Sequence, residues 1–151
     1  MSERYVLLLE QAGALIDGVA YPIANYANLS ALLYQTLSDI NWAGFYLIEN
    51  GKLVLGPFQG KPACIEIEIG KGVCGTAVAR DATVVVKNVH EFPGHIACDG
   101  ASMSEIVIPI HLKGKIIGVL DIDSPVEGRF SQTDQLGLEA VVRLIEKNLE
   151  I

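Results

Sequence analysis

The sequence contains few cysteines, few basic residues and no long apolar run. Its 11 Lys and Arg residues against 18 Asp and Glu give a net charge of −7, and the basic residues form no cluster. We therefore expect neither a nucleic acid nor an anionic membrane as partner. The first 18 residues lack a basic start and an extended apolar stretch. This argues against a signal peptide or a membrane span and favours a cytoplasmic protein.

Cysteine occurs three times, at Cys64, Cys74 and Cys98, and no two of these form a C-x2-C pair. The set His90, His95 and Cys98 offers no second close pair of ligands either, so we expect no metal site. In the cytoplasm thiols are normally kept reduced, and a disulfide there is more often transient and catalytic or sensory than structural. Thiol redox chemistry is therefore the leading interpretation.

The chain has 151 residues, half of them hydrophobic, and shows no repeat or linker. This length suits one domain over residues 1–151 with its own core. Helical spacing of apolar residues predicts two N-terminal helices, over about 3–17 and 25–38, and a C-terminal helix from 131 to about 149.

Strand-like patterns fill the middle of the chain. Asn50-Gly51 and Lys113-Gly114 each lie between two apolar runs, which is typical of tight hairpins. The sequence thus predicts an α+β fold with about six antiparallel strands flanked by the helices. The expected strands are 41–48, 52–58, 65–69, 83–86, 106–112 and 115–122.

The longest stretch without periodicity, residues 87–104, carries Cys98 together with Pro93, Gly94 and Gly100. Long irregular loops in compact domains are usually functional or disordered. We expect a mobile active-site loop here, and the alternative is a solvent loop with an incidental cysteine.

Two acidic residues, Asp121 and Asp123, lie two positions apart on a predicted strand and so share a face. They indicate either a solvated strand end or a pocket for a cation, in which at least one carboxyl pKa would be raised. Glu105 could join them. A simple turn at 113–114 would pair it with Ile122 on the other face, so a bulge near Pro109, or a place in the loop, would be required.

Aromatic residues Trp42 and Tyr46 are four positions apart on a predicted strand, and they too share a face. They form either one wall of a pocket or part of the core. The run Gly70 to Gly75 matches G-x-G-x-x-G, a dinucleotide-binding pattern. The strand before it alternates Ile with Glu and no full crossover helix fits after it, so we expect a tight turn instead.

Six blocks of the sequence together resemble the free methionine-R-sulfoxide reductases, small enzymes with the GAF fold. The blocks are NWAGFY, GPFQG, GVCGTA, NVHEFPGHIACD, SEIVIPI and GVLDIDSP. The resemblance extends from about residue 41 to 135 and implies a GAF-like arrangement of the α+β elements. The opening and closing helices carry no family-specific pattern.

The resemblance implies thiol-dependent reduction of free L-methionine-R-sulfoxide to L-methionine. Cys98 would attack the sulfoxide, and Cys64 or Cys74, with Cys64 favoured, would resolve the resulting sulfenic acid into a disulfide. Thioredoxin would then reduce that disulfide, and no bound cofactor would be needed. Protection against oxidative stress would be the corresponding role.

In the pocket, the resemblance makes Glu105, Asp121 and Asp123 the acidic ligands of the substrate and Trp42 and Tyr46 its aromatic wall. It also suggests a homodimer, as do the amphipathic terminal helices. The alternative function is a GAF-type module that binds a small molecule or senses redox state without turnover. The short chain weighs against that alternative, because a sensor is normally joined to an output domain.

Overall fold

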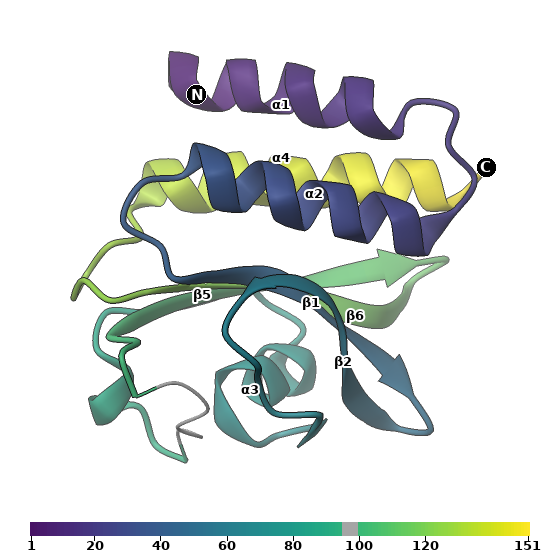
Figure 1. Ribbon diagram of the computed structural model, residues 1–151. Helices are drawn as coiled ribbons and strands as arrows, with labels where there is room; N and C mark the ends of the chain where they lie inside the picture. Colours follow the sequence, from purple (N-terminus) through teal and green to yellow (C-terminus); the bar gives the residue numbers. More distant parts are fainter. Residues whose placement is uncertain (95–99) are drawn as a thin grey trace.

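The computed structural model describes residues 1–94 and 100–151 and shows an antiparallel sheet with helices on both faces (Figure 1). The predicted α+β fold is confirmed. In chain order the elements are α1 (Glu3–Ile16), α2 (Pro22–Thr36), β1 (Trp42–Glu49), β2 (Lys52–Gly60), β3 (Glu66–Glu68), α3 (Gly72–Arg80), β4 (Val84–Val86), the short 3-10 helix η1 (Val89–Glu91), β5 (Ser104–Leu112), β6 (Lys115–Ser124) and α4 (Gln132–Leu149).

The six strands form one sheet in the order β3-β2-β1-β6-β5-β4. Both predicted hairpins are present, and the two residues of each turn have positive φ: 53° and 77° at Asn50 and Gly51, and 53° and 78° at Lys113 and Gly114. Turns of this left-handed kind match the twist of the flanking strands. The two hairpins are joined by antiparallel pairing of β1 with β6, strands far apart in the sequence that lie together at the centre of the sheet.

A β-bulge between Ile110 and His111 shifts the register of the β5–β6 hairpin by one residue. Beyond the bulge, Glu105 pairs with Asp123 and not with Ile122. The bulge expected near Pro109 is thus the device that turns Glu105 to the face of the two aspartates, and Glu105 lies on the strand and not in the loop. A shift of one residue inverts every side chain that follows, so this single irregularity decides which residues share the pocket face.

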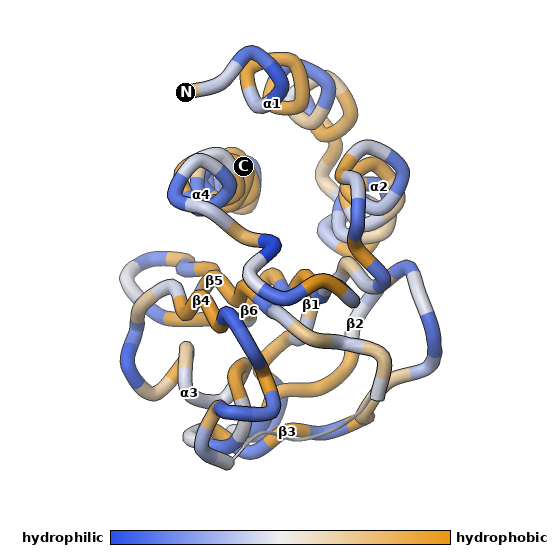
Figure 2. The backbone as a smooth tube through the Cα atoms, turned by 90° about the vertical axis from the view of Figure 1, so that its left-hand side faces the viewer, coloured by the Kyte–Doolittle hydropathy of each residue, from blue (hydrophilic) through white to orange (hydrophobic). Residues whose placement is uncertain are grey.

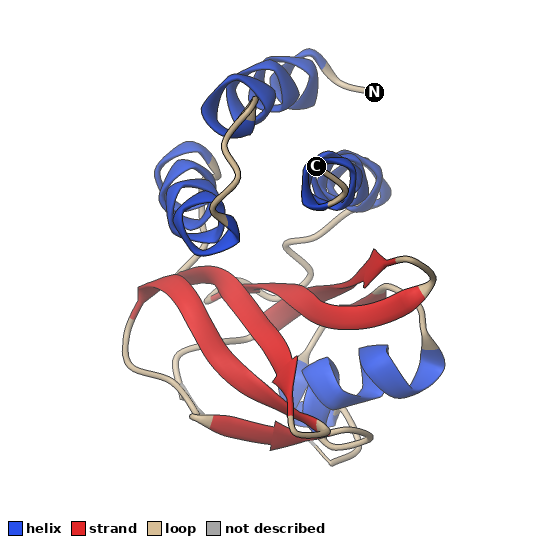
Figure 3. Ribbon diagram, turned by 90° about the vertical axis from the view of Figure 1, so that its right-hand side faces the viewer, coloured by secondary structure: helices blue, strands red, loops and turns tan. Residues whose placement is uncertain are grey.

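Helices α2 and α4 cover one face of the sheet, and α1 lies across both of them on the side away from the sheet (Figures 1 and 3). Figure 2 shows that β1, β5 and β6 are largely hydrophobic where they pass under these helices. The core on this face includes the fully buried side chains of Leu8, Leu29, Leu33, Phe45, Ile110 and Leu138. Among the described helices none is both long and apolar enough to cross a membrane.

Helix α3 covers the opposite face, where a second core surrounds Leu53, Val107 and Val119. It begins at Gly72, directly after the glycine-rich turn. The start of α2 differs from prediction. This helix begins at Pro22, whose fixed φ suits a first helical turn, and not at residue 25.

Tyr5 fastens α1 to the start of α4. Its hydroxyl donates a hydrogen bond of 2.6 Å to Asp134 Oδ1, and Asp134 also forms a capping box with Ser131. Gly137 lies one turn further along α4, directly beneath the Tyr5 ring, where an added Cβ would overlap ring atoms. By contrast, a Cβ added to Gly13 of α1 would lie in open space.

These two glycines form a matched pair for a test of helix packing. Gly137→Ala should destabilise the protein by about 1–3 kcal/mol, because overpacking displaces Tyr5 from Asp134. Gly13→Ala should stabilise it by up to about 1 kcal/mol through helix propensity alone. Urea unfolding measures both changes, and equal effects of the two substitutions would contradict this account of the α1–α4 contact.

Candidate active site

Three acidic side chains gather on the sheet face that α3 covers. Glu105 projects from β5 and Asp121 and Asp123 from β6, all on the face of Val107 and Val119. Glu105 and Asp121 are buried, with 8% and 5% of their surface exposed, and Asp123 is half-buried. Glu105 lies directly opposite Asp123, a pairing of like charges that destabilises a sheet when both are ionised.

Cys74 completes the cluster from the first turn of α3. Its buried Sγ lies 4.0 Å from Glu105 Oε2, and one donor atom each of Cys74, Glu105 and Asp121 all lie within 4.8 Å of one another. Asp121 Oδ1 is buried and accepts no hydrogen bond from the residues that the structure describes. An unsatisfied buried oxygen costs free energy, so this atom is placed to accept a hydrogen bond from a ligand.

Burial dominates the electrostatics of the cluster. It raises the pKa of the Cys74 thiol well above its usual value, and the nearby Asp121 and Glu105 raise it further. The pKa of Glu105 is raised in the same way, first by burial and then by Asp121 and Asp123. Burial also raises the pKa of Asp121, although hydrogen bonds from its neighbours oppose the shift. The cluster therefore holds protons that it could release or donate when a cationic ligand arrives.

A glycine-rich turn brings α3 close enough to the sheet for Cys74 to reach the acids. Gly70 and Gly72 have φ of 91° and 61°, and the Gly70 N–H donates a bond of 2.9 Å to the Gly75 carbonyl. A Cβ on Gly75 would overlap the carbonyl oxygen of Glu68. The G-x-G-x-x-G pattern thus makes the predicted tight turn, and it also allows a close contact between helix and strand.

Aromatic rings form a wall beside the acids. Trp42 and Tyr46 of β1 lie on one face with stacked rings 5.9 Å apart, and Trp42 also stacks on Phe58 of β2 at 5.1 Å. Phe58 was not predicted. The signal for it is Gly44, which lies between the two aromatic positions, pairs with Phe58 and leaves no room for a Cβ.

The same two β1 residues fasten the segment that carries Cys64. Trp42 Nε1 donates to the Lys61 carbonyl at 3.1 Å, and the Tyr46 hydroxyl donates to the Cys64 carbonyl at 2.8 Å. Cys64 is half-buried and disulfide-bonded, whereas Cys74 is a free, buried thiol. The predicted nucleophile, Cys98, lies outside the described residues.

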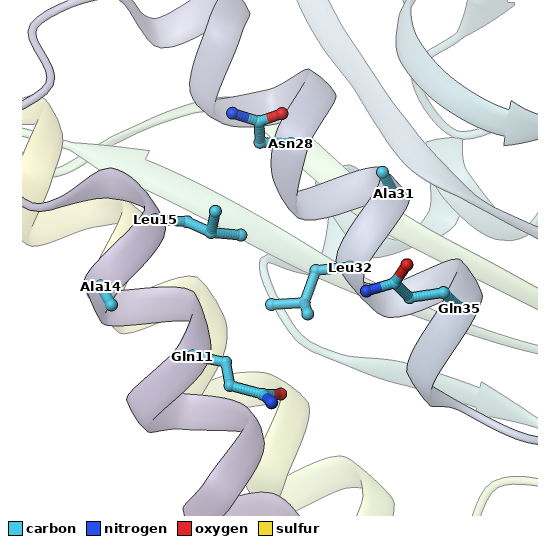
Figure 4. Close-up of a pocket in the computed structure, with 7 residues that line it drawn as sticks. All are labelled: Gln11, Ala14, Leu15, Asn28, Ala31, Leu32 and Gln35. Carbon is cyan, nitrogen blue, oxygen red and sulfur yellow. The ribbon is translucent and has the colours of Figure 1, made fainter.

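A surface pocket lies away from this cluster, between α1 and α2 on the face of the sheet opposite α3. Its volume is about 510 Å³, and Leu15 and Leu32 project into it from the two helices (Figure 4). Its lining contains amide and apolar side chains but no acid, base or thiol. It therefore offers no redox or acid–base chemistry.

Comparison with known proteins assigns the chain to a family. Residues 6–149 match the GAF domain. The chain is 57% identical over 148 residues to the free methionine-R-sulfoxide reductase of Escherichia coli, an alignment that spans 98% of this chain and 90% of that protein. The chain belongs to the free methionine-R-sulfoxide reductase family. The resemblance seen in the sequence blocks is thereby confirmed.

Solved structures of such reductases have the same fold. The chain superposes with a TM-score of 0.93 on the complex with substrate of fRMsr of Staphylococcus aureus, at 57% identity, covering 96% of this chain and 95% of that one. It matches the free methionine-R-sulfoxide reductase of Neisseria meningitidis in complex with its substrate equally well, with a TM-score of 0.93 at 41% identity, covering 99% and 92%.

The buried acids should make the reductase less stable at high pH. Folding raises the pKa of Asp121. Its carboxyl therefore lowers the free energy of unfolding progressively as pH rises above the pKa that this carboxyl has in the unfolded chain. Asp121→Asn should therefore increase the free energy of unfolding, and the gain should be larger at about pH 8 than at about pH 5. Urea unfolding at both pH values measures it.

Glu127→Gln, which removes the same charge from an exposed position, serves as the control and should leave stability nearly unchanged at both pH values. A loss of stability in Asp121→Asn at about pH 8 would show that the carboxylate is satisfied in the folded protein, against the account above.

Proposed function

We propose that this protein reduces free L-methionine-R-sulfoxide to L-methionine through its cysteines. One observation carries the proposal: a buried acidic cluster beside an aromatic wall, in a chain 57% identical to a reductase named for this reaction. The cluster offers negative charge for an ammonium group, and the wall offers contact area for a sulfur-containing side chain.

Selectivity for the free amino acid follows from two of the buried acids. Glu105 and Asp121 are buried, and among the residues that the structure describes neither forms an ion pair with a lysine or arginine. The ammonium group of a free amino acid can supply the missing positive charge and hydrogen-bond donors. A methionine sulfoxide within a peptide has no ammonium group and would leave these carboxylates buried and unpaired.

The same acids can supply the proton that the reaction consumes. Reduction of a sulfoxide requires protonation of the oxygen that leaves sulfur, and a carboxyl with a raised pKa is better suited to donate that proton. Burial, together with Asp121 and Asp123, raises the pKa of Glu105 well above its usual value. We therefore assign Glu105 as the proton donor and Asp121 and Asp123 as ligands of the ammonium group.

In the thiol steps, the Cys98 thiolate attacks the sulfoxide sulfur, methionine leaves, and Cys98 becomes a sulfenic acid. The thiol of a second cysteine then attacks the sulfenic sulfur, which forms a disulfide and releases water. A thioredoxin dithiol reduces this disulfide and becomes oxidised in turn. Such recycling needs a compartment in which thiols are kept reduced, which supports a cytoplasmic location.

Cys64 is better suited than Cys74 to the resolving step. It is half-buried on a loop that Trp42 and Tyr46 fasten beside the wall, and it is disulfide-bonded in the structure. Cys74 is fully enclosed, and burial among acids keeps its thiol protonated and therefore weakly nucleophilic. These features support Cys64 as the resolving cysteine and leave Cys74 with another role.

Substitution of each cysteine tests the assignment. Cys64→Ser should still form about one methionine per chain from the free R-sulfoxide. It should lose NADPH consumption with thioredoxin and thioredoxin reductase by at least about tenfold, because no disulfide can form. Cys98→Ser should lose both activities, whereas Cys74→Ser should retain thioredoxin-dependent recycling.

Burst measurements and steady-state assays on the three variants separate these outcomes. Full multiple turnover by Cys98→Ser would contradict the proposed chemistry. Loss of recycling in Cys74→Ser with retention in Cys64→Ser would exchange the roles of the two cysteines.

We also infer a homodimer. The outer helices carry exposed apolar side chains, among them Val6, Leu7 and Leu15 of α1 and Ile23 and Tyr34 of α2. Association of two such surfaces would remove them from water. Sedimentation velocity measures the assembly state. A dimer that Leu7→Glu dissociates would agree with this inference, and a monomer at all concentrations would contradict it.

A further inference from the structure

The cluster of Cys74, Glu105 and Asp121 combines one sulfur donor with two carboxylate donors. From this arrangement we propose that the three side chains bind a soft divalent metal ion, zinc or cadmium, directly within the acidic pocket. No sequence motif indicates such a site, because Cys74 is 31 positions from Glu105 and belongs to no ligand pattern. Folding alone brings α3, β5 and β6 together here.

The three donor atoms are close enough that small side-chain movements would bring them to the distances of a tetrahedral metal site. With Zn–S near 2.3 Å and Zn–O near 2.0–2.2 Å, ligand atoms around a zinc ion lie about 3.5 Å apart. The three donor atoms already lie within 4.8 Å of one another, and Cys74 Sγ is 4.0 Å from Glu105 Oε2. Side-chain movements of about 1 Å would close the site, and the larger cadmium ion needs less. The fourth position would remain open.

An unpartnered atom points to a ligand at this place. Asp121 Oδ1 is buried and receives no hydrogen bond from the described residues, and one oxygen of this carboxylate lies within 4.8 Å of donor atoms of Cys74 and Glu105. A metal ion satisfies such an oxygen directly. The two carboxylates and a thiolate would together offset the charge of a dication.

The donor set also selects the type of metal. Magnesium and calcium take six or more oxygen ligands, whereas thiolate favours zinc and related soft ions. Three protein ligands that include sulfur match the latter preference. The site shares no residue with His90, His95 and Cys98, the set from which we expected no metal site.

A bound ion would exclude the amino-acid substrate. This consequence rests on the proposed function, in which the same carboxylates hold the ammonium group of the substrate. A divalent ion and the ammonium group cannot occupy the acids together, so each should weaken the binding of the other.

Cadmium titration of a chain with one thiol tests the site. In the double variant Cys64→Ser, Cys98→Ser, Cys74 is the only cysteine, and any sulfur-to-cadmium charge-transfer absorption must arise from it. We expect a saturable band at one cadmium per chain. Adding Asp121→Asn should weaken cadmium binding by at least about tenfold, because loss of even an outer partner of a metal site costs about 10–100-fold.

Matched variants identify the ligands. Cys74→Ala or Cys74→Ser in the same background should abolish the band, with circular dichroism confirming that the fold is retained. Glu127→Gln, which alters an exposed carboxylate, should leave the affinity unchanged. No band in the double variant, or equal affinity with and without Asp121→Asn, would overturn the proposal.

Free L-methionine then separates this inference from the proposed function. If both hold, saturating methionine should raise the apparent dissociation constant of cadmium. If cadmium binding depends on Asp121 but its dissociation constant does not change with methionine, the metal site would be supported. The proposed position of the substrate ammonium group would then be contradicted.

Discussion

The burial of two like-charged acids, Glu105 and Asp121, side by side on one face of the sheet is the constraint on which the rest of the account depends. Glu105 and Asp121 are more than nine-tenths buried, and Asp123 directly opposes Glu105 across the hairpin. Carboxyl groups in such a place either keep protons or require a cation. The proposed reaction and the proposed metal site each bring such a cation to the cluster.

The two faces of the sheet differ in composition. The face under α2 and α4 is a continuous apolar core, to which α1 is fastened by the bond between Tyr5 and Asp134. The face under α3 combines a smaller core with acids, a thiol and an aromatic wall. Because functional groups of this kind cost stability, the larger core on the other face is what allows the acids to remain buried.

Sequence periodicity was sufficient to predict which residues share a face within one strand. The two-residue spacing of Asp121 and Asp123 and the four-residue spacing of Trp42 and Tyr46 both correspond to the observed faces. Turn chemistry was equally informative, since Asn50-Gly51 and Lys113-Gly114 form the expected hairpins. These are local properties of the backbone, and local sequence determines them.

Relations between elements could not be predicted in the same way. The face of Glu105 depends on one bulge, which the sequence left as one of two alternatives, the other being a place for Glu105 in the loop. The approach of Cys74 to the acids depends on the glycine turn before α3, and the third ring of the wall, Phe58, depends on the β1–β2 register. The roles of Cys64, Cys74 and Cys98 come from family membership and chemistry, and they stay predictions.

Binding of free and amine-blocked ligands to the same protein tests most directly whether the buried acids recognise an ammonium group. Titration calorimetry would compare L-methionine-R-sulfoxide with its N-acetyl derivative on the wild-type protein and on Asp121→Asn. We predict that blocking the amine weakens binding to the wild type by roughly 100-fold or more and that the substitution removes most of this difference. Equal affinity of the wild type for the two ligands would contradict the central claim, because the acids would then not bind the amine.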